Sequence, residues 1–151
     1  MMSLASNRFT TEPGHLVMIE VPQEAMARVR DAILEIDPLA QGDYDRVAFT
    51  SAAGVQQFRA LGTGRNRATQ NAVTVPCVDL RLFTALQGLD LARLVEAAYH
   101  AHPYEEPVIF MTATTRMRHV PGLDEDNPNR FWNRPDADWL PKDHRADRTV
   151  D

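Results

Sequence analysis

The chain lacks several features that would assign it to a class at once. It contains a single cysteine, Cys77, among 151 residues, so no intramolecular disulfide can form. Neither a signal-peptide pattern nor an apolar run long enough to cross a membrane is present in the sequence. We therefore expect a cytoplasmic protein without a membrane partner. Cys77 stands in an apolar run, which predicts a small buried hydrophobe rather than a reactive thiol.

Basic charge is also scarce. Lys and Arg number 16 against 21 Asp and Glu, which gives a formal net charge of −5. Nucleic-acid binding through general neutralisation of phosphates needs a basic face, so this balance predicts no nucleic-acid partner. Hydrophobic residues make up 44% of the chain, which is typical of a globular domain with a core of its own.

Apolar periodicity predicts one α+β domain over residues 15–116. Two amphipathic helices and an antiparallel sheet in the order βαββαβ, with an extra hairpin strand, indicate a ferredoxin-like sandwich in which both helices cover one sheet face. The expected elements are a strand at 15–21, a helix at 23–37, a hairpin of strands 44–50 and 55–61, a strand at 73–83, a helix capped by Asp90 that ends near 101, and a strand at 108–111 that fades by 115.

The two ends of the chain differ from this domain. Residues 1–14 are polar and show little periodicity, which predicts a flexible leader. Residues 117–151 form an irregular arm rich in Pro and Asp that nevertheless contains both tryptophans. Trp132 and Trp139 are therefore expected to anchor the arm on this chain or on a neighbouring subunit, with binding of an external partner as the alternative.

Residues 102–107, the 102–107 segment, concentrate the candidate functional side chains. Pro103 and Pro107 disfavour a helical conformation for the residues before them, so the preceding helix must end near 101 or 102 and the segment must run extended. Polar or titratable side chains then share one stiff turn: His102, Tyr104, Glu105 and Glu106.

Two other stretches supply candidate side chains. The connection 62–72 carries Arg65 and Arg67, which could pair bidentately with a phosphate or carboxylate, although it lacks the spacing of a P-loop. Asp43 and Tyr44 precede an expected strand and are assigned to turn chemistry unless the fold brings them to the 102–107 segment.

Residues 97–107, together with 42–51 and 54–61, resemble the inserted domain of the Nif-three-like family, which is itself similar to the trimeric CutA and PII folds. CutA proteins carry a similar His-Pro-Tyr-Glu run between their second helix and final strand. The resemblance covers residues 15–115 and implies a stand-alone ferredoxin-like module, trimeric, with its sheets turned inward and no settled activity. The dinuclear metal centre of that family belongs to a surrounding domain without a counterpart in these residues, so its ligands are not carried over.

Several roles are open for these candidates. Our preferred prediction is a non-catalytic structural or regulatory homo-oligomer, most simply a trimer, in which Tyr104, Glu105 and Glu106 bond across subunits. Catalysis has the weakest support, because neighbouring carboxylates on an extended segment point to opposite faces and make a poor acid–base pair.

Two ligand-binding roles are the alternatives to this assembly role. A divalent metal such as zinc or copper would use His102 with Glu105 or Glu106. Small-molecule sensing in the manner of PII proteins would place a ligand in clefts between subunits, close to Arg65 and Arg67.

Overall fold

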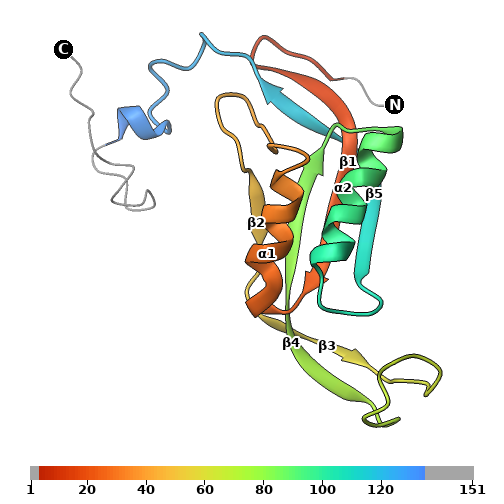
Figure 1. Ribbon diagram of the computed structural model, residues 1–151. Helices are drawn as coiled ribbons and strands as arrows, with labels where there is room; N and C mark the ends of the chain where they lie inside the picture. Colours follow the sequence, from red (N-terminus) through yellow and green to blue (C-terminus); the bar gives the residue numbers. More distant parts are fainter. Residues whose placement is uncertain (1–3, 135–151) are drawn as a thin grey trace.

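Two helices lie side by side on one face of an antiparallel sheet (Figure 1). The structure is a computed structural model that describes residues 4–134 of the chain. Trp139, one of the two expected anchors, lies outside the described residues. The elements are β1 (Phe9–Val21), α1 (Gln23–Leu34), β2 (Ala48–Thr50), β3 (Gly54–Phe58), β4 (Val73–Thr84), α2 (Gly88–Ala101), β5 (Val108–His119) and a short 3-10 helix η1 (Phe131–Asn133).

The sheet has the order β2-β4-β1-β5, and β3 also pairs with β4. β2 lies opposite Leu80–Leu82 of β4 and β3 opposite Val73–Cys77, so both follow the same edge of β4. At the interruption between them the Ser51 hydroxyl accepts the Asp79 N–H at 2.9 Å. With β2 and β3 taken as one interrupted strand, the order is βαββαβ, which confirms the predicted ferredoxin-like α+β fold.

The predicted hairpin of residues 44–50 and 55–61 is wrong. Both strands pair with β4, and the hairpin that exists joins β3 to β4 through residues 59–72, hereafter the hairpin loop. It projects from the body of the molecule beyond the helices (Figure 1). Period-two alternation identifies a strand but does not name its partner, which is decided by register and neighbouring surfaces.

Strands β1 and β5 are both longer than the sequence predicts. β1 begins at Phe9, within the expected leader, and β5 continues to His119, within the expected arm. Their added parts pair with each other, Phe9 opposite His119, and Arg116 Nε lies 2.8 Å from Glu12 Oε2. The backbone ladder between the two strands gives these polar residues a regular structure that their side-chain pattern does not reveal.

The predicted helix boundaries also need correction. α1 ends at Leu34 rather than at residue 37. α2 begins at Gly88 with Gln87 as its N-cap, so Asp90 lies in the first turn and makes no capping hydrogen bond. The predicted C-terminal end is confirmed: α2 stops at Ala101, and His102 has extended backbone angles, as the following proline requires.

The hydrophobic core lies between the helices and the sheet. Alternate residues of β1 point into it, so Val17 and Ile19 are 1% and 0% exposed. Cys77 is buried, as predicted. The other fully buried members include Val29 and Ile33 of α1, Leu80 and Leu82 of β4, and Leu94 and Ala98 of α2.

The opposite side of the sheet, hereafter the open face, is also apolar. Its residues alternate with the core residues along the strands, and neither helix covers it (Figure 1). Leu16, Phe49 and Phe110 are 42%, 58% and 51% exposed. The guanidinium carbon of Arg116 lies 4.1 Å from the Phe83 ring centroid and that of Arg81 5.5 Å from the Phe49 ring centroid. The open-face hydrophobes are Leu16, Met18, Phe49, Phe83 and Phe110.

Candidate functional site

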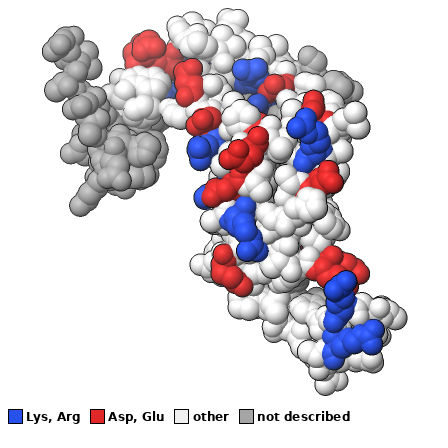
Figure 2. All heavy atoms as spheres, in the orientation of Figure 1, with Lys and Arg blue, Asp and Glu red and all other residues white. Residues whose placement is uncertain are grey.

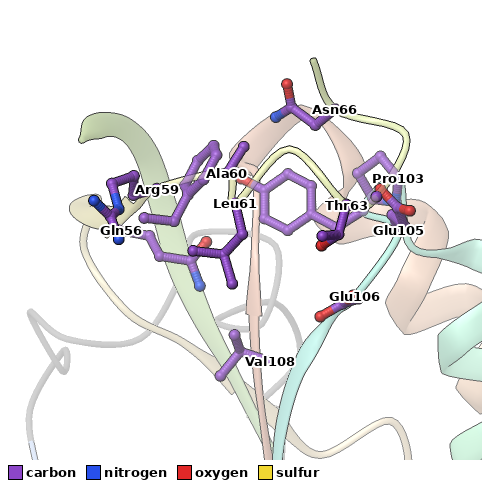
Figure 3. A pocket seen from close by; sticks show the side chains of 13 residues that line it. Gln56, Arg59, Ala60, Leu61, Thr63, Asn66, Pro103, Glu105, Glu106 and Val108 are labelled. Carbon is purple, nitrogen blue, oxygen red and sulfur yellow. The ribbon is translucent and has the colours of Figure 1, made fainter. Parts of the chain in front are cut away.

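A cleft of about 550 Å³ separates the hairpin loop from the 102–107 segment (Figure 3). Strand β3 and the loop after it form one wall, and the turn between α2 and β5 forms the other. The fold thus joins two stretches far apart in the sequence. The lining residues are Gln56, Phe58, Arg59, Ala60, Leu61, Thr63, Gly64, Asn66, Pro103, Tyr104, Glu105, Glu106 and Val108.

His102 fixes the end of α2 to the sheet. It is 7% exposed, and its Nε2 lies 2.9 Å from the carbonyl oxygen of Glu20 in β1. Its Nδ1 accepts the backbone N–H of Tyr104 at 3.1 Å. Because Nδ1 is an acceptor, the proton is on Nε2, which donates to Glu20, and the imidazole is neutral. Burial lowers the pKa of His102, which agrees with this neutral form.

Tyr104 lies edge-on against the His102 ring, with centroids 4.9 Å apart. Its hydroxyl oxygen is buried and has no hydrogen-bond partner among the described residues. Burial raises the pKa of Tyr104, and the nearby Cys77 and Glu24 add to the shift. The hydroxyl therefore remains protonated at neutral pH, a buried donor left without an acceptor.

Glu105 holds the hairpin loop against the 102–107 segment. Its Oε1 and Oε2 accept the backbone N–H of Arg65 at 3.0 and 3.2 Å. A Cβ added to Gly64 would lie 3.0 Å from Glu105 Oε1, so the absence of a side chain there gives the carboxylate room. Glu106 is exposed, lines the cleft, and makes no hydrogen bond or ion pair within residues 4–134.

The arginines predicted to bind an anion take part differently. Arg65 reaches Glu105 through its backbone amide, and the Nε of Arg67 lies 3.4 Å from the carbonyl oxygen of Gly64. Neither side chain lines the cleft, whereas Arg59 does. Figure 2 shows basic side chains gathered over the projecting hairpin. Sequence reasoning missed Arg59, because nothing in its spacing separates it from other exposed polar residues beside a strand.

Asp43 and Tyr44 lie away from the cleft. They belong to the loop between α1 and β2, which is fixed to the far end of β5 by a hydrogen bond from Gln41 to the carbonyl oxygen of Met117 at 3.1 Å. The 102–107 segment adjoins the other end of β5, roughly 30 Å away at strand spacing. Tyr44 is 67% exposed and closes a local bridge with Gln41, which is the turn role expected for it.

The geometry also bears on the metal interpretation. Within residues 4–134, no group of three or more His, Cys, Asp or Glu side chains is placed to hold a metal ion. Since both ring nitrogens of His102 are engaged with the backbone, His102 could bind a metal only after losing one of these hydrogen bonds. The metal role of His102, Glu105 and Glu106 stays a prediction without a formed ligand set.

Residues 120–134 are held to the start of β1. The buried carboxylate of Asp124 forms ion pairs with Arg8 and Arg130, and the N–H of Val120 donates to the carbonyl oxygen of Arg8 at 2.9 Å. Trp132, the expected anchor, donates its indole N–H to the carbonyl oxygen of Glu125 at 3.0 Å. Its hydrogen bond therefore lies within the arm, whereas Asp124 pairs with Arg8 beside the start of β1.

Comparison with known proteins supports the fold. A Bacillus cereus protein related to NIF3, of known crystal structure, superposes with a TM-score of 0.56 at 22% sequence identity. The match covers 69% of this chain and 26% of that protein, so this chain corresponds to about a quarter of it. No protein-family model and no curated protein matches the sequence. Among the described residues, no helix is long and apolar enough to cross a membrane.

Proposed function

We propose that this chain is a non-catalytic structural or regulatory module that works as a homo-oligomer, related to the inserted domain of Nif-three-like proteins. The open face of the sheet carries this proposal. Leu16, Phe49 and Phe110 are exposed on this face, and the described residues supply no second layer for them. A contiguous apolar surface on a globular chain is typical of a surface that meets another protein.

We take a second copy of the chain as the partner of this face. Polar side chains lie beside these hydrophobes. The side-chain amide of Gln56 donates to Oε2 of Glu20 at 2.7 Å, and Nη2 of Arg81 lies 3.4 Å from Oδ2 of Asp79. An apolar centre with satisfied polar groups around it is the usual anatomy of a protein interface. We favour a closed trimer in which the three sheets face inward, because this is the assembly that the resemblance to the CutA and PII folds implies.

Native mass spectrometry of the full chain, repeated over a range of protein concentrations, tests this proposal. Phe110→Arg places a charge on the open face, whereas Leu89→Arg places the same charge on the 85%-exposed first turn of α2. We expect a trimer for the wild type and for Leu89→Arg and a smaller species for Phe110→Arg. A monomeric wild type, or a Phe110→Arg variant that assembles normally, would contradict the proposal.

Small-molecule binding is a second candidate function, and the cleft favours it. Its volume of about 550 Å³ lies in the range common for ligand sites, roughly 300–1,000 Å³. The cleft is formed within one chain, in contrast to the clefts between subunits expected from PII proteins. The same mass spectra test for a retained ligand: extra mass per subunit would favour binding, and zinc-dependent mass lost in His102→Ala would favour the metal alternative.

A further inference from the structure

We propose that the cleft between the hairpin loop and the 102–107 segment binds an amphipathic amine. Its ammonium group pairs with the carboxylate of Glu106, and its apolar body covers Phe58, Leu61 and Val108. This inference deepens the small-molecule alternative, and one chain contributes every residue that lines the cleft.

The two neighbouring glutamates have different roles. Glu105 is occupied, since both of its oxygens accept the Arg65 N–H and hold the hairpin loop in place. Glu106 faces the cleft without a partner within the described residues. A carboxylate held on a stiff, proline-bounded turn is an ordered acceptor that is ready for a cation.

The other walls of the cleft carry apolar side chains, which favour a ligand with an apolar body. Leu61 is 70% exposed and Phe58 37% exposed, although both border a concave surface. Figure 3 places Leu61 between Glu106 on one side and Arg59 on the other, with Val108 below it. A ligand whose ammonium lies at Glu106 would therefore extend its body across these side chains and remove their apolar surface from water.

The charged side chains that line the cleft favour a cationic ligand over an anionic one. Two carboxylates, Glu105 and Glu106, line the cleft against one guanidinium, that of Arg59. A phosphate or carboxylate close to Glu106 would meet a like charge, whereas an ammonium would meet an opposite one. The cleft consequently discriminates against the anions that Arg65 and Arg67 were predicted to bind, since neither of these side chains lines it.

Titration of the full chain with phenethylamine tests this inference by two-dimensional NMR of backbone amides and by calorimetry. The neutral isostere 2-phenylethanol and the anion phenylacetate serve as matched ligands. We expect phenethylamine to bind roughly 2- to 5-fold more tightly than the alcohol, because an ion pair at an exposed carboxylate contributes up to about 1 kcal/mol. Phenylacetate should bind most weakly, and the shifted amides should include Leu61, Glu106 and Val108.

Variants locate the charge that is responsible. Glu106→Gln should reduce phenethylamine affinity to that of the alcohol, whereas Glu35→Gln, at an exposed glutamate just after α1, should leave it unchanged. Leu61→Ser should weaken the amine and the alcohol alike. Equal affinities for amine and alcohol, an unaffected Glu106→Gln variant, or no saturable binding would overturn the inference. Native mass spectra of the same variants report assembly separately, so loss of binding and loss of the oligomer are distinguishable.

Discussion

The two faces of the sheet differ although the same strands form them. Along β1, Leu16 is 42% exposed and its neighbour Val17 is 1% exposed, and the alternation continues with half-buried Met18 and fully buried Ile19. All four residues are apolar. The difference in their exposure therefore comes from the helices, which cover one face of the sheet while the described residues leave the other face uncovered.

The covered face owes its burial to two helices, and a hydrogen bond from the middle of α1 to the end of α2 joins them. α1 contributes Val29 and Ile33, and α2 contributes Leu94. The guanidinium Nε of Arg28 in α1 donates to the carbonyl oxygen of Ala101 at 2.8 Å, which satisfies an unpaired carbonyl at the end of α2. The helices thus form one layer, and the sheet has only one such layer in the described chain.

Ile19→Ala and Met18→Ala test this contrast most strongly. Ile19 is 0% exposed, so its truncation leaves a cavity and should lower the free energy of unfolding by about 2–5 kcal/mol. Met18→Ala, one residue away on the open face, should cost less than half as much in a sample diluted to monomer. Urea denaturation at low protein concentration measures both, and equal losses would show that the two faces are not distinct.

His102→Ala should have the next largest effect. The substitution removes both ring hydrogen bonds and leaves the carbonyl of Glu20 without its imidazole partner. An unsatisfied buried polar group typically lowers stability by about 1–3 kcal/mol. Denaturant unfolding measures the change. Because His100 is exposed in the last turn of α2, His100→Ala is the matched control and should be close to neutral.

Acidification should lower the free energy of unfolding, as His102→Ala does. Since burial lowers the pKa of His102, the unfolded chain takes up a proton near the ordinary histidine value while the folded chain does not. The unfolded state therefore binds more protons between the two pKa values, and stability falls as the pH drops through that window. Unfolding curves from pH 7 downward should show a smaller decline for His102→Ala than for the wild type; identical declines would contradict the assignment.

Assembly through the open face should make the melting temperature depend on protein concentration. If it joins copies of the chain, the melting temperature of the wild type should rise with protein concentration, because the oligomer stabilises the folded state. Phe110→Ser should lose most of this dependence while changing the melting temperature of the dilute protein little. Differential scanning fluorimetry over a range of concentrations measures both quantities, and a concentration-independent wild type would count against assembly.

Gly64→Ala should have the smallest effect on stability. The new methyl group would lie 3.0 Å from the end of the Glu105 side chain, which is flexible enough to move away. We expect a nearly unchanged free energy of unfolding but faster hydrogen exchange at the Arg65 amide, whose acceptor has shifted. Unchanged exchange would show that Glu105 does not hold the loop.

The sequence predicted the candidate site only in part. Pro103 and Pro107 correctly placed the end of α2 and the stiff turn, because proline restricts the backbone locally. The meeting of that turn with the hairpin loop was not predictable, since it follows from the pairing of β3 with β4. The same error of pairing kept Leu61 out of the predicted site.

Local pattern by itself determined the class of fold, the presence of two amphipathic helices, and the buried positions such as Ile19 and Ile33. These depend on periods of 3.6 and 2 that each segment carries within itself. Only the tertiary structure decided that β2 and β3 share one edge of β4, that His102 bonds to β1, and that Glu105 holds the hairpin loop while Glu106 faces a cleft. Such contacts join residues far apart in the chain, and the partner of a strand edge or a carboxylate is fixed by geometry that no single segment encodes.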